Sequence, residues 1–222
     1  MANMLTSTEE NYLKAIHTLE QEFTGAVSTN AIADRLETKA SSVTDMVRKL
    51  AEKELVDYTK YKGVSLTHVG QSVALRIIRK HRLWEVFLVD KLQFGWDEVH
   101  EIAEQLEHIQ SVKLTDRLEE FLDFPKFDPH GDPIPDKNGF ITRRKKACLL
   151  HELEVGVTAT VVGVNDSSPS FLQYLDKHGI RLGDEIEIVE YFDFDSSQLV
   201  LVNGERLNLS YSVVSNLCVE PK

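Results

Sequence analysis

Residues 80–108 carry side chains that bind divalent metals, and their spacing places them on helical faces. His81 and Glu85 are four residues apart, so they share one face of a helix. That face also carries apolar residues at helical spacing, namely Ala74, Ile78, Leu88 and Leu92. A carboxylate and an imidazole within an apolar stripe cost free energy unless something compensates them. The pair therefore belongs either to a metal site or to a satisfied polar pair inside the core.

Four more candidates follow on the next predicted helix: His100, Glu104, Glu107 and His108. They stand at positions i, i+4, i+7 and i+8, which span an arc of roughly 100°. Together with the first pair they offer a divalent metal oxygen and nitrogen donors, and no thiolate. Their arc lies opposite Val99, Ile102 and Leu106, so an ordinary solvent-exposed face would give the same pattern. Spacing by itself leaves both interpretations open.

Length and composition indicate an ordinary soluble protein. The 222 residues suffice for one large or two modest domains, and 42% are apolar and 27% charged. No segment approaches the roughly 20 apolar residues of a membrane helix, and residues 1–10 lack the features of a secretory signal. Cys148 and Cys218 are too few for a disulfide framework or a cysteine zinc site. We expect a cytoplasmic protein with no membrane contact.

Charge is unevenly distributed along the chain, although the net charge is −11. Residues 1–95 carry 13 Lys and Arg against 12 Asp and Glu, whereas residues 96–222 carry 12 against 24. An acidic region is repelled by phosphates, so any contact with DNA is expected in the first part of the chain.

The first part reads as three helices and a hairpin. Helices are predicted over residues 6–23, over residues 28–36, and from Ser41 or Ser42 to residue 54. The first would begin with a capping box made either by Thr6 with Glu9 or by Ser7 with Glu10. Residues 55–66 contain two short runs in which apolar and polar residues alternate, and this pattern predicts a β-hairpin. This order is the winged helix-turn-helix, whose third helix enters the major groove of double-stranded DNA.

The predicted DNA-binding residues lie on that third helix and at the hairpin tip. They are Thr38, Lys39, Ser41, Ser42, Asp45, Arg48, Lys60 and Lys62. Hydroxyls and the helix N-terminus suit phosphates, Arg48 suits a base or a phosphate, and Asp45 suits a cytosine amino group. The solvated faces of a small helical domain would carry similar residues, so this alternative stays open.

Helices are predicted over residues 67–91, 97–110 and 114–124, followed by a Pro- and Gly-rich connector at 125–140. Apolar helices between a DNA-binding module and a later domain favour a homodimer, and hence a palindromic operator. Strands are predicted at 157–164, 185–191, 198–202, 205–209 and 218–220, with a helix at 170–178. The fold class is therefore α+β: a winged helix-turn-helix at 1–70, a helical dimerisation and metal-binding domain at 71–140, and an SH3-like β-barrel at 141–222.

Several segments resemble the diphtheria toxin repressor family of metal-dependent bacterial regulators, in particular its manganese transport regulators with a C-terminal SH3-like domain. They are residues 10–13 (ENYL), 79–88 (RKHRLWEVFL), 100–108 (HEIAEQLEH), 124–135 (FPKFDPHGDPIP) and 174–184 (YLDKHGIRLGD). The resemblance spans nearly the whole chain. It implies a homodimeric repressor of metal-uptake genes, not an enzyme.

The resemblance also implies two metal sites. One would use Glu104, Glu107 and His108 with Asn11, and the other would use His81, Glu85 and His100. In relatives with the extra domain the connector and barrel add ligands, and the matching positions here are Asp128, His130 and Asp166. A cysteine at position 104 accompanies iron-type members and a carboxylate accompanies manganese-type members. Glu104 therefore favours Mn²⁺ as the cofactor, with Fe²⁺ as the second candidate.

Three positions depart from the manganese-type pattern. Asn11 stands where those relatives have a carboxylate, and Lys14 stands where some of them offer a second acid. Lys14 cannot bind a metal while it is charged. Asp128 replaces a cysteine that close relatives often have. A carboxylate oxygen is a harder ligand than a thiolate sulfur, so this change favours manganese or ferrous iron over zinc.

Two other classes of protein compete with this interpretation. A carboxylate-bridged di-metal oxidase would need Glu-x-x-His on two helices, and that motif is absent from the sequence. A metal-independent winged-helix regulator is the stronger alternative, and comparing DNA binding with manganese and with a chelator distinguishes it. No nucleophile arrangement indicates catalysis. We expect a metal to tie helices 6–23, 67–91 and 97–110 together and so to set the spacing of the paired recognition helices.

Overall fold

The computed structural model describes residues 5–23, 25–60 and 62–222, and the chain divides into two compact units. The first unit contains the described residues up to His81, together with Gln105–Ser111 and Pro135–Phe140. The second contains Arg82–Glu104, Val112–Ile134 and Ile141–Lys222. The boundaries predicted at residues 70 and 140 stay predictions.

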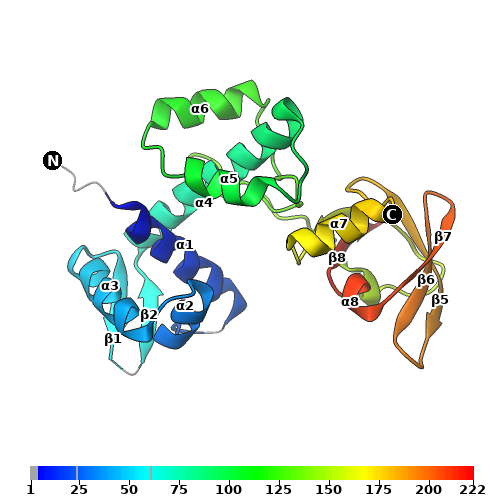
Figure 1. Ribbon diagram of the computed structural model, residues 1–222, viewed down its shortest axis with the longest axis horizontal. Helices are drawn as coiled ribbons and strands as arrows, with labels where there is room; N and C mark the ends of the chain where they lie inside the picture. The colour runs from blue at the N-terminus through cyan, green and yellow to red at the C-terminus, as the bar shows by residue number, and fades with distance from the viewer. Residues whose placement is uncertain (1–4, 24, 61) are drawn as a thin grey trace. The chain divides into compact units, whose positions relative to one another are not determined.

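The first unit is a winged helix-turn-helix, as predicted (Figure 1). Its elements are α1 (Ser7–Glu22), α2 (Thr29–Arg35), α3 (Ala40–Glu52), β1 (Val56–Thr59), β2 (Gly63–Leu66) and the first part of α4 (His68–Leu92). β1 and β2 form an antiparallel hairpin. One face of each helix is apolar and packs into a common core that includes Leu13, Ile16, Ile32, Val43, Val47, Leu50 and Val64.

Hydroxyl caps explain where most of these helices begin. Thr6 and Glu9, the first of the two predicted pairs, form the capping box of α1. Ser28 caps α2, and the backbone N–H of Gly70 donates to the Thr67 side chain at the start of α4. The prediction that Ser41 or Ser42 caps α3 was wrong. The backbone N–H of Val43 already donates to the carbonyl of Lys39, so the helix begins at Ala40 and both serines lie inside its first turn.

The helical part of the second unit holds the rest of α4 with α5 (Val99–Leu106) and α6 (Val112–Phe121). Its small core contains Leu83, Val86, Leu118, Leu122 and Ile134. Both α5 and α6 are shorter than predicted. The helix at α5 ends at Leu106, so Glu107 and His108 lie in the turn that follows it.

The remainder of the second unit is a small antiparallel sheet with short helices, as predicted for the SH3-like domain (Figure 1). Its strands are β3 (Cys148–Leu149), β4 (Thr158–Val164), β5 (Glu185–Phe192), β6 (Ser197–Val202), β7 (Glu205–Leu209) and β8 (Leu217–Pro221), in the order β3-β8-β4-β5-β6-β7. Its helices are α7 (Pro169–Lys177), α8 (Tyr211–Val214) and the 3-10 turn η1 (Leu150–Glu152). β3, η1 and α8 were not predicted, because two to four residues are too short to show a period.

His130 and Gly131, in the segment between α6 and β3, are held against β4 inside the second unit. The backbone N–H of Val164 donates to the carbonyl of His130 at 2.9 Å. Gly131 has a φ of +90°, and a Cβ there would lie 2.2 Å from the Val162 carbonyl oxygen. Only glycine allows this close approach. The connector is therefore an ordered segment at His130, which matters for the site below.

The α+β class and the three-part architecture are confirmed. Within the described residues, no helix combines the length and the apolarity needed to cross a membrane.

Candidate metal centre

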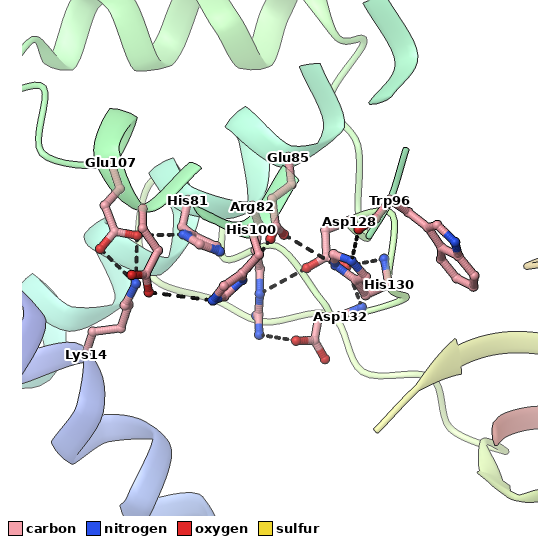
Figure 2. A network of polar contacts seen from close by, with 11 residues as sticks. Lys14, His81, Arg82, Glu85, Trp96, His100, Glu107, Asp128, His130 and Asp132 are labelled. Atoms are coloured by element: carbon pink, nitrogen blue, oxygen red, sulfur yellow. Dashed lines mark hydrogen bonds and ion pairs between the residues drawn. The ribbon is translucent and has the colours of Figure 1, made fainter. Parts of the chain in front are cut away.

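Glu85, Asp128 and His130 form a compact group in the second unit, here called the Glu85 cluster (Figure 2). One ligand atom from each residue lies within 4.8 Å of the others. All three are buried, with exposed fractions of 2%, 6% and 5%. Buried acids at this separation repel one another unless a cation or protons compensate them.

Backbone geometry positions the two connector residues of this cluster. Asp128 Oδ1 accepts hydrogen bonds from the backbone N–H groups of His130 and Asp132, both at 2.9 Å. These bonds close a local turn that presents the other carboxylate oxygen. Asp128 Oδ2 lies 3.4 Å from Nε of Arg82, one turn before Glu85 on α4. Arg82 also donates to Asp132 at 2.8 Å, which fixes the guanidinium at the edge of the cluster.

The imidazole of His130 is oriented by a main-chain carbonyl. Its Nε2 lies 2.8 Å from the carbonyl oxygen of Trp96, so Nε2–H donates there. Nδ1 then faces Glu85, 3.6 Å from Oε2 (Figure 2). A histidine whose second nitrogen donates to a carbonyl has the tautomer and orientation of a metal ligand.

His100 reaches the same cluster from α5. Its Nδ1 lies 3.3 Å from Oε1 of Glu85, and its Nε2 lies 3.6 Å from Glu104. The side chains of His100 and Glu104 are 53% and 46% exposed, so this edge of the cluster is open to water. Glu85 therefore has a histidine on each of its two oxygens.

Charge in the Glu85 cluster is incompletely balanced. Burial, with the charges of Glu85 and Asp132, raises the pKa of Asp128 well above its usual range, although Arg82 and His130 oppose this. Burial lowers the pKa of His130, but its hydrogen bond to Glu85 and the charges of Glu85 and Asp128 outweigh burial and raise it to about 9. Protons, together with Arg82, thus balance the acids when no metal is bound. The donor set of carboxylate oxygens and imidazole nitrogens fits a hard divalent cation such as Mn²⁺.

A second group of buried charges lies in the first unit around Glu107, here called the Glu107 cluster (Figure 2). The carboxylate of Glu107 is completely buried. Lys14 Nζ donates to its Oε2 at 2.8 Å and lies 2.8 Å from its Oε1. His81 Nδ1 lies 2.6 Å from the same Oε2. Burial raises the pKa of Glu107, but the His81 hydrogen bond and the charge of Lys14 outweigh burial and hold it below its ordinary value.

His108 lies between two acids: its Nε2 is 3.8 Å from Oε1 of Glu107, and its nearer partner is Glu10. Its Nδ1 lies 2.6 Å from Oε2 of Glu10, and the Gln110 side chain donates to Oε1 of Glu10 at 2.8 Å. Glu10 is buried on α1. The first-helix acid beside His108 is therefore Glu10, one residue before the predicted Asn11. The side-chain oxygen of Asn11 is buried and meets no hydrogen-bond donor among the residues that the structure describes.

Asp166 is the predicted ligand from the SH3-like domain. Its Oδ1 accepts a hydrogen bond from the backbone N–H of Ser168 at 2.8 Å, in the loop before α7. Among the described residues, Asp166 does not belong to the Glu85 cluster.

The predicted DNA-binding residues share one property, which is that all of them are solvent-exposed: Thr38, Lys39, Ser41, Ser42, Asp45, Arg48, Lys60 and Lys62. Asp45 Oδ1 lies 3.8 Å from Arg48 Nη1 on the same helical face. This exposed ion pair is worth little, so Arg48 can exchange Asp45 for a phosphate or a base.

Sequence reasoning missed Glu10, Arg82, Trp96 and the contact that Lys14 makes with Glu107. A signal existed for the first helix, since Glu10 and Lys14 are four residues apart and share a face. Nothing in the sequence pattern indicates that the Trp96 carbonyl contacts His130, because a main-chain carbonyl is present at every residue.

Models of three protein families match the chain. "Iron dependent repressor, N-terminal DNA binding domain" matches residues 4–64, "Iron dependent repressor, metal binding and dimerisation domain" matches 67–136, and "FeoA domain" matches 148–221. These matches cover the winged helix-turn-helix, the helical segment with Glu85 and Glu107, and the small sheet.

Relatives and solved structures agree with the family models. The diphtheria toxin repressor of Corynebacterium glutamicum is 37% identical over 216 residues, or 92% of each chain. The iron-dependent repressor IdeR of Mycobacterium tuberculosis is 37% identical over 134 residues, and the match spans only 60% of this chain and 57% of IdeR.

Among solved structures, a manganese-dependent transcriptional repressor in complex with manganese matches with a TM-score of 0.88 at 36% identity. That match covers 96% of this chain and 100% of the other. The manganese regulator SloR matches with a TM-score of 0.74 at 35% identity, covering 98% and 100%. The chain therefore belongs to the diphtheria toxin repressor family of iron- and manganese-dependent transcriptional repressors.

Proposed function

We propose that this protein represses metal-uptake genes when Mn²⁺ is plentiful, with Fe²⁺ as the second candidate metal. The observation that supports this most is the Glu85 cluster. Its acids are buried, its histidine is oriented for coordination, and the one arginine beside it, Arg82, does not keep the pKa of Asp128 from rising. A divalent cation would replace those protons and remove the repulsion between Glu85 and Asp128.

The residues that would hold the ion are Glu85, Asp128 and His130, with His100 from α5. When bound, the ion supplies positive charge and coordination bonds to groups on three separate segments. Its effect would be structural, since it would hold α4, α5 and the connector together in one arrangement. His81, Glu104, Glu107, His108, Asn11 and Asp166 stay predictions as ligands.

The exposed face of α3 and the hairpin tip would bind a double-stranded DNA operator. Exposure of all eight predicted residues supports this, as does the family of DNA-binding repressors to which the chain belongs. We propose a cytoplasmic homodimer that binds a palindromic site, because two-fold symmetry in the protein matches two-fold symmetry in the DNA.

Metal and DNA would be thermodynamically linked. If the metal favours the DNA-competent arrangement, then DNA must raise the affinity for metal by the same factor. A coupling of about 1–3 kcal/mol, roughly 5- to 150-fold, suffices for a switch. The helix α4 contributes residues to both units and is the segment through which such coupling would pass.

The test uses the full chain after treatment with a chelator. Mn²⁺ binding is followed by the loss of the electron paramagnetic resonance signal of free Mn²⁺. DNA binding is followed by mobility shift with duplexes selected from a random library in Mn²⁺. We expect Asp128→Asn to lose Mn²⁺ binding and Mn²⁺-stimulated DNA binding together. The matched control Asp132→Asn, four residues later and outside the proposed ligand set, should retain both.

The competing function is a metal-independent winged-helix regulator. Equal DNA affinity with Mn²⁺ and with chelator would establish that alternative and overturn the proposal.

A further inference from the structure

Lys14 lies where a cation is needed. The carboxylate of Glu107 is completely buried, and both of its oxygens lie 2.8 Å from Lys14 Nζ (Figure 2). The Lys14 side chain is itself only 18% exposed. A buried ionised carboxylate costs free energy unless a close positive charge or hydrogen bonds compensate it, and here a lysine of the same chain supplies the positive charge.

We propose that Lys14 is a built-in cation that takes the place of a metal ion at Glu107. The metal-responsive site is then the Glu85 cluster alone. This second statement rests on the proposed function, whereas the first concerns the Glu107 cluster by itself.

The neighbouring histidines support the assignment because each already has a close contact with a carboxylate. His81 Nδ1 lies 2.6 Å from Glu107 Oε2, on the oxygen to which Lys14 donates. His108 Nδ1 lies 2.6 Å from Glu10, whose other oxygen accepts from Gln110. An incoming divalent ion would have to displace an ammonium group from Glu107 and break the His108–Glu10 contact. The charge of the displaced lysine, still tethered to α1, would then oppose the ion.

Asn11 contributes no charge to the Glu107 cluster. It offers a buried but neutral oxygen, so the acids of this cluster are Glu107 and Glu10, and Glu10 is already in contact with His108 and Gln110. Lys14 and Glu107 are 93 residues apart in the chain, so their contact joins α1 to the segment after α5 within the first unit. We infer that this junction is permanent, while the junction made by the Glu85 cluster depends on metal.

The test counts Mn²⁺ ions per chain in the chelator-treated full-length protein. Free Mn²⁺ is measured by electron paramagnetic resonance during titration, and folding is checked by far-ultraviolet circular dichroism. We expect the wild type and Glu107→Gln each to bind one ion per chain. Lys14→Met should bind two, and the double variant Lys14→Met/Glu107→Gln should return to one.

A matched control removes a different lysine of the same region. Lys80 is half-buried, and its Nζ lies 3.5 Å from the Ile109 carbonyl oxygen. Lys80→Met should still bind one ion. If Lys14→Met fails to fold, Lys14→Glu replaces it, because a carboxylate at position 14 removes the built-in cation and adds a ligand; it too should bind two ions.

The outcomes separate the two proposals. Two ions in the wild type, with one lost in Glu107→Gln, would overturn the role of Lys14 and leave the proposed function intact. If the wild type binds no ion, the proposed function is overturned. In that case Lys14→Met would still support the role of Lys14 if it bound one ion that is lost in the double variant Lys14→Met/Glu107→Gln. An unchanged count in both Lys14 variants would overturn that role.

Discussion

The Glu107 cluster and the Glu85 cluster contain the same kinds of groups but differ in how their charge is balanced. Each has buried carboxylates within reach of a histidine. In the first, Lys14 and His81 hold the pKa of Glu107 below its ordinary value despite burial. In the second, burial and neighbouring acids raise the pKa of Asp128, even though Arg82 lies 3.4 Å away. Acid and histidine together therefore do not identify a metal site. The two clusters differ in whether the fixed cation outweighs burial, as Lys14 does with His81 at Glu107, or fails to, as Arg82 does at Asp128.

The largest effect is expected on the stability of the metal-free protein. Glu107→Gln leaves Lys14 without its buried partner, which costs about 3–5 kcal/mol in other buried ion pairs. Because the pKa of Glu107 is lowered, this stabilisation is present above its unfolded pKa and is lost as pH falls through its folded pKa. Urea unfolding at pH 7 and at successively lower pH measures it. An equal difference between variant and wild type at every pH would contradict the ion-pair explanation.

The second-largest effect is on the affinity for Mn²⁺, and it is tested by the same glutamate-to-glutamine change in each cluster. Glu85→Gln removes a charged oxygen ligand, so Mn²⁺ affinity should fall by at least about 100-fold, or roughly 2.7 kcal/mol. Glu107→Gln makes the same chemical change outside the proposed ligand set and should leave Mn²⁺ affinity nearly unchanged. Isothermal titration calorimetry measures both variants. Similar losses in the two variants would remove the distinction between the clusters.

The pH dependence of Mn²⁺ affinity follows from His130. Its pKa is raised to about 9, so between pH 7 and pH 9 the metal must displace a proton from the imidazole. We expect affinity to rise by up to about tenfold per pH unit in this range and to level off above it. Calorimetry in buffers of different ionisation enthalpy should detect about one proton released per ion. A flat profile would exclude His130 as a ligand.

The smallest expected effect is a gain in the stability of the metal-free protein, whereas Glu107→Gln should lower that stability. The pKa of Asp128 is raised, so its ionised form favours unfolding, and this cost appears as pH rises from its unfolded pKa through its folded pKa. Asp128→Asn keeps the side-chain oxygen that accepts from His130 and Asp132 but removes the charge. Thermal melting of the metal-free variant should therefore show a modest gain in stability at pH 8. A loss of stability would mean that the ionised carboxylate stabilises the fold.

Much of the fold was accessible from local patterns. The capping box at Thr6 and Glu9, the 3.6-residue period of α1 and α3, and the alternation of β5 to β7 all depend on residues that are neighbours in the chain. The segments around His81, His100 and Asp128 also carried the family resemblance, which the comparisons confirmed. The exact start of α3 was not predictable, because Lys39 ends the preceding turn without a side-chain cap.

The partners of the charged groups came only from the tertiary structure. Lys14 reaches Glu107 across 93 residues, Glu10 reaches His108 across 98, and the Trp96 carbonyl reaches His130 across 34. The sequence determined which residues are able to bind a metal, because the chemistry of a side chain and its place on a helical face are local properties. Packing of distant segments decided that Lys14 and His81 balance Glu107 while Arg82 and protons balance Asp128, because electrostatic balance depends on distance in space.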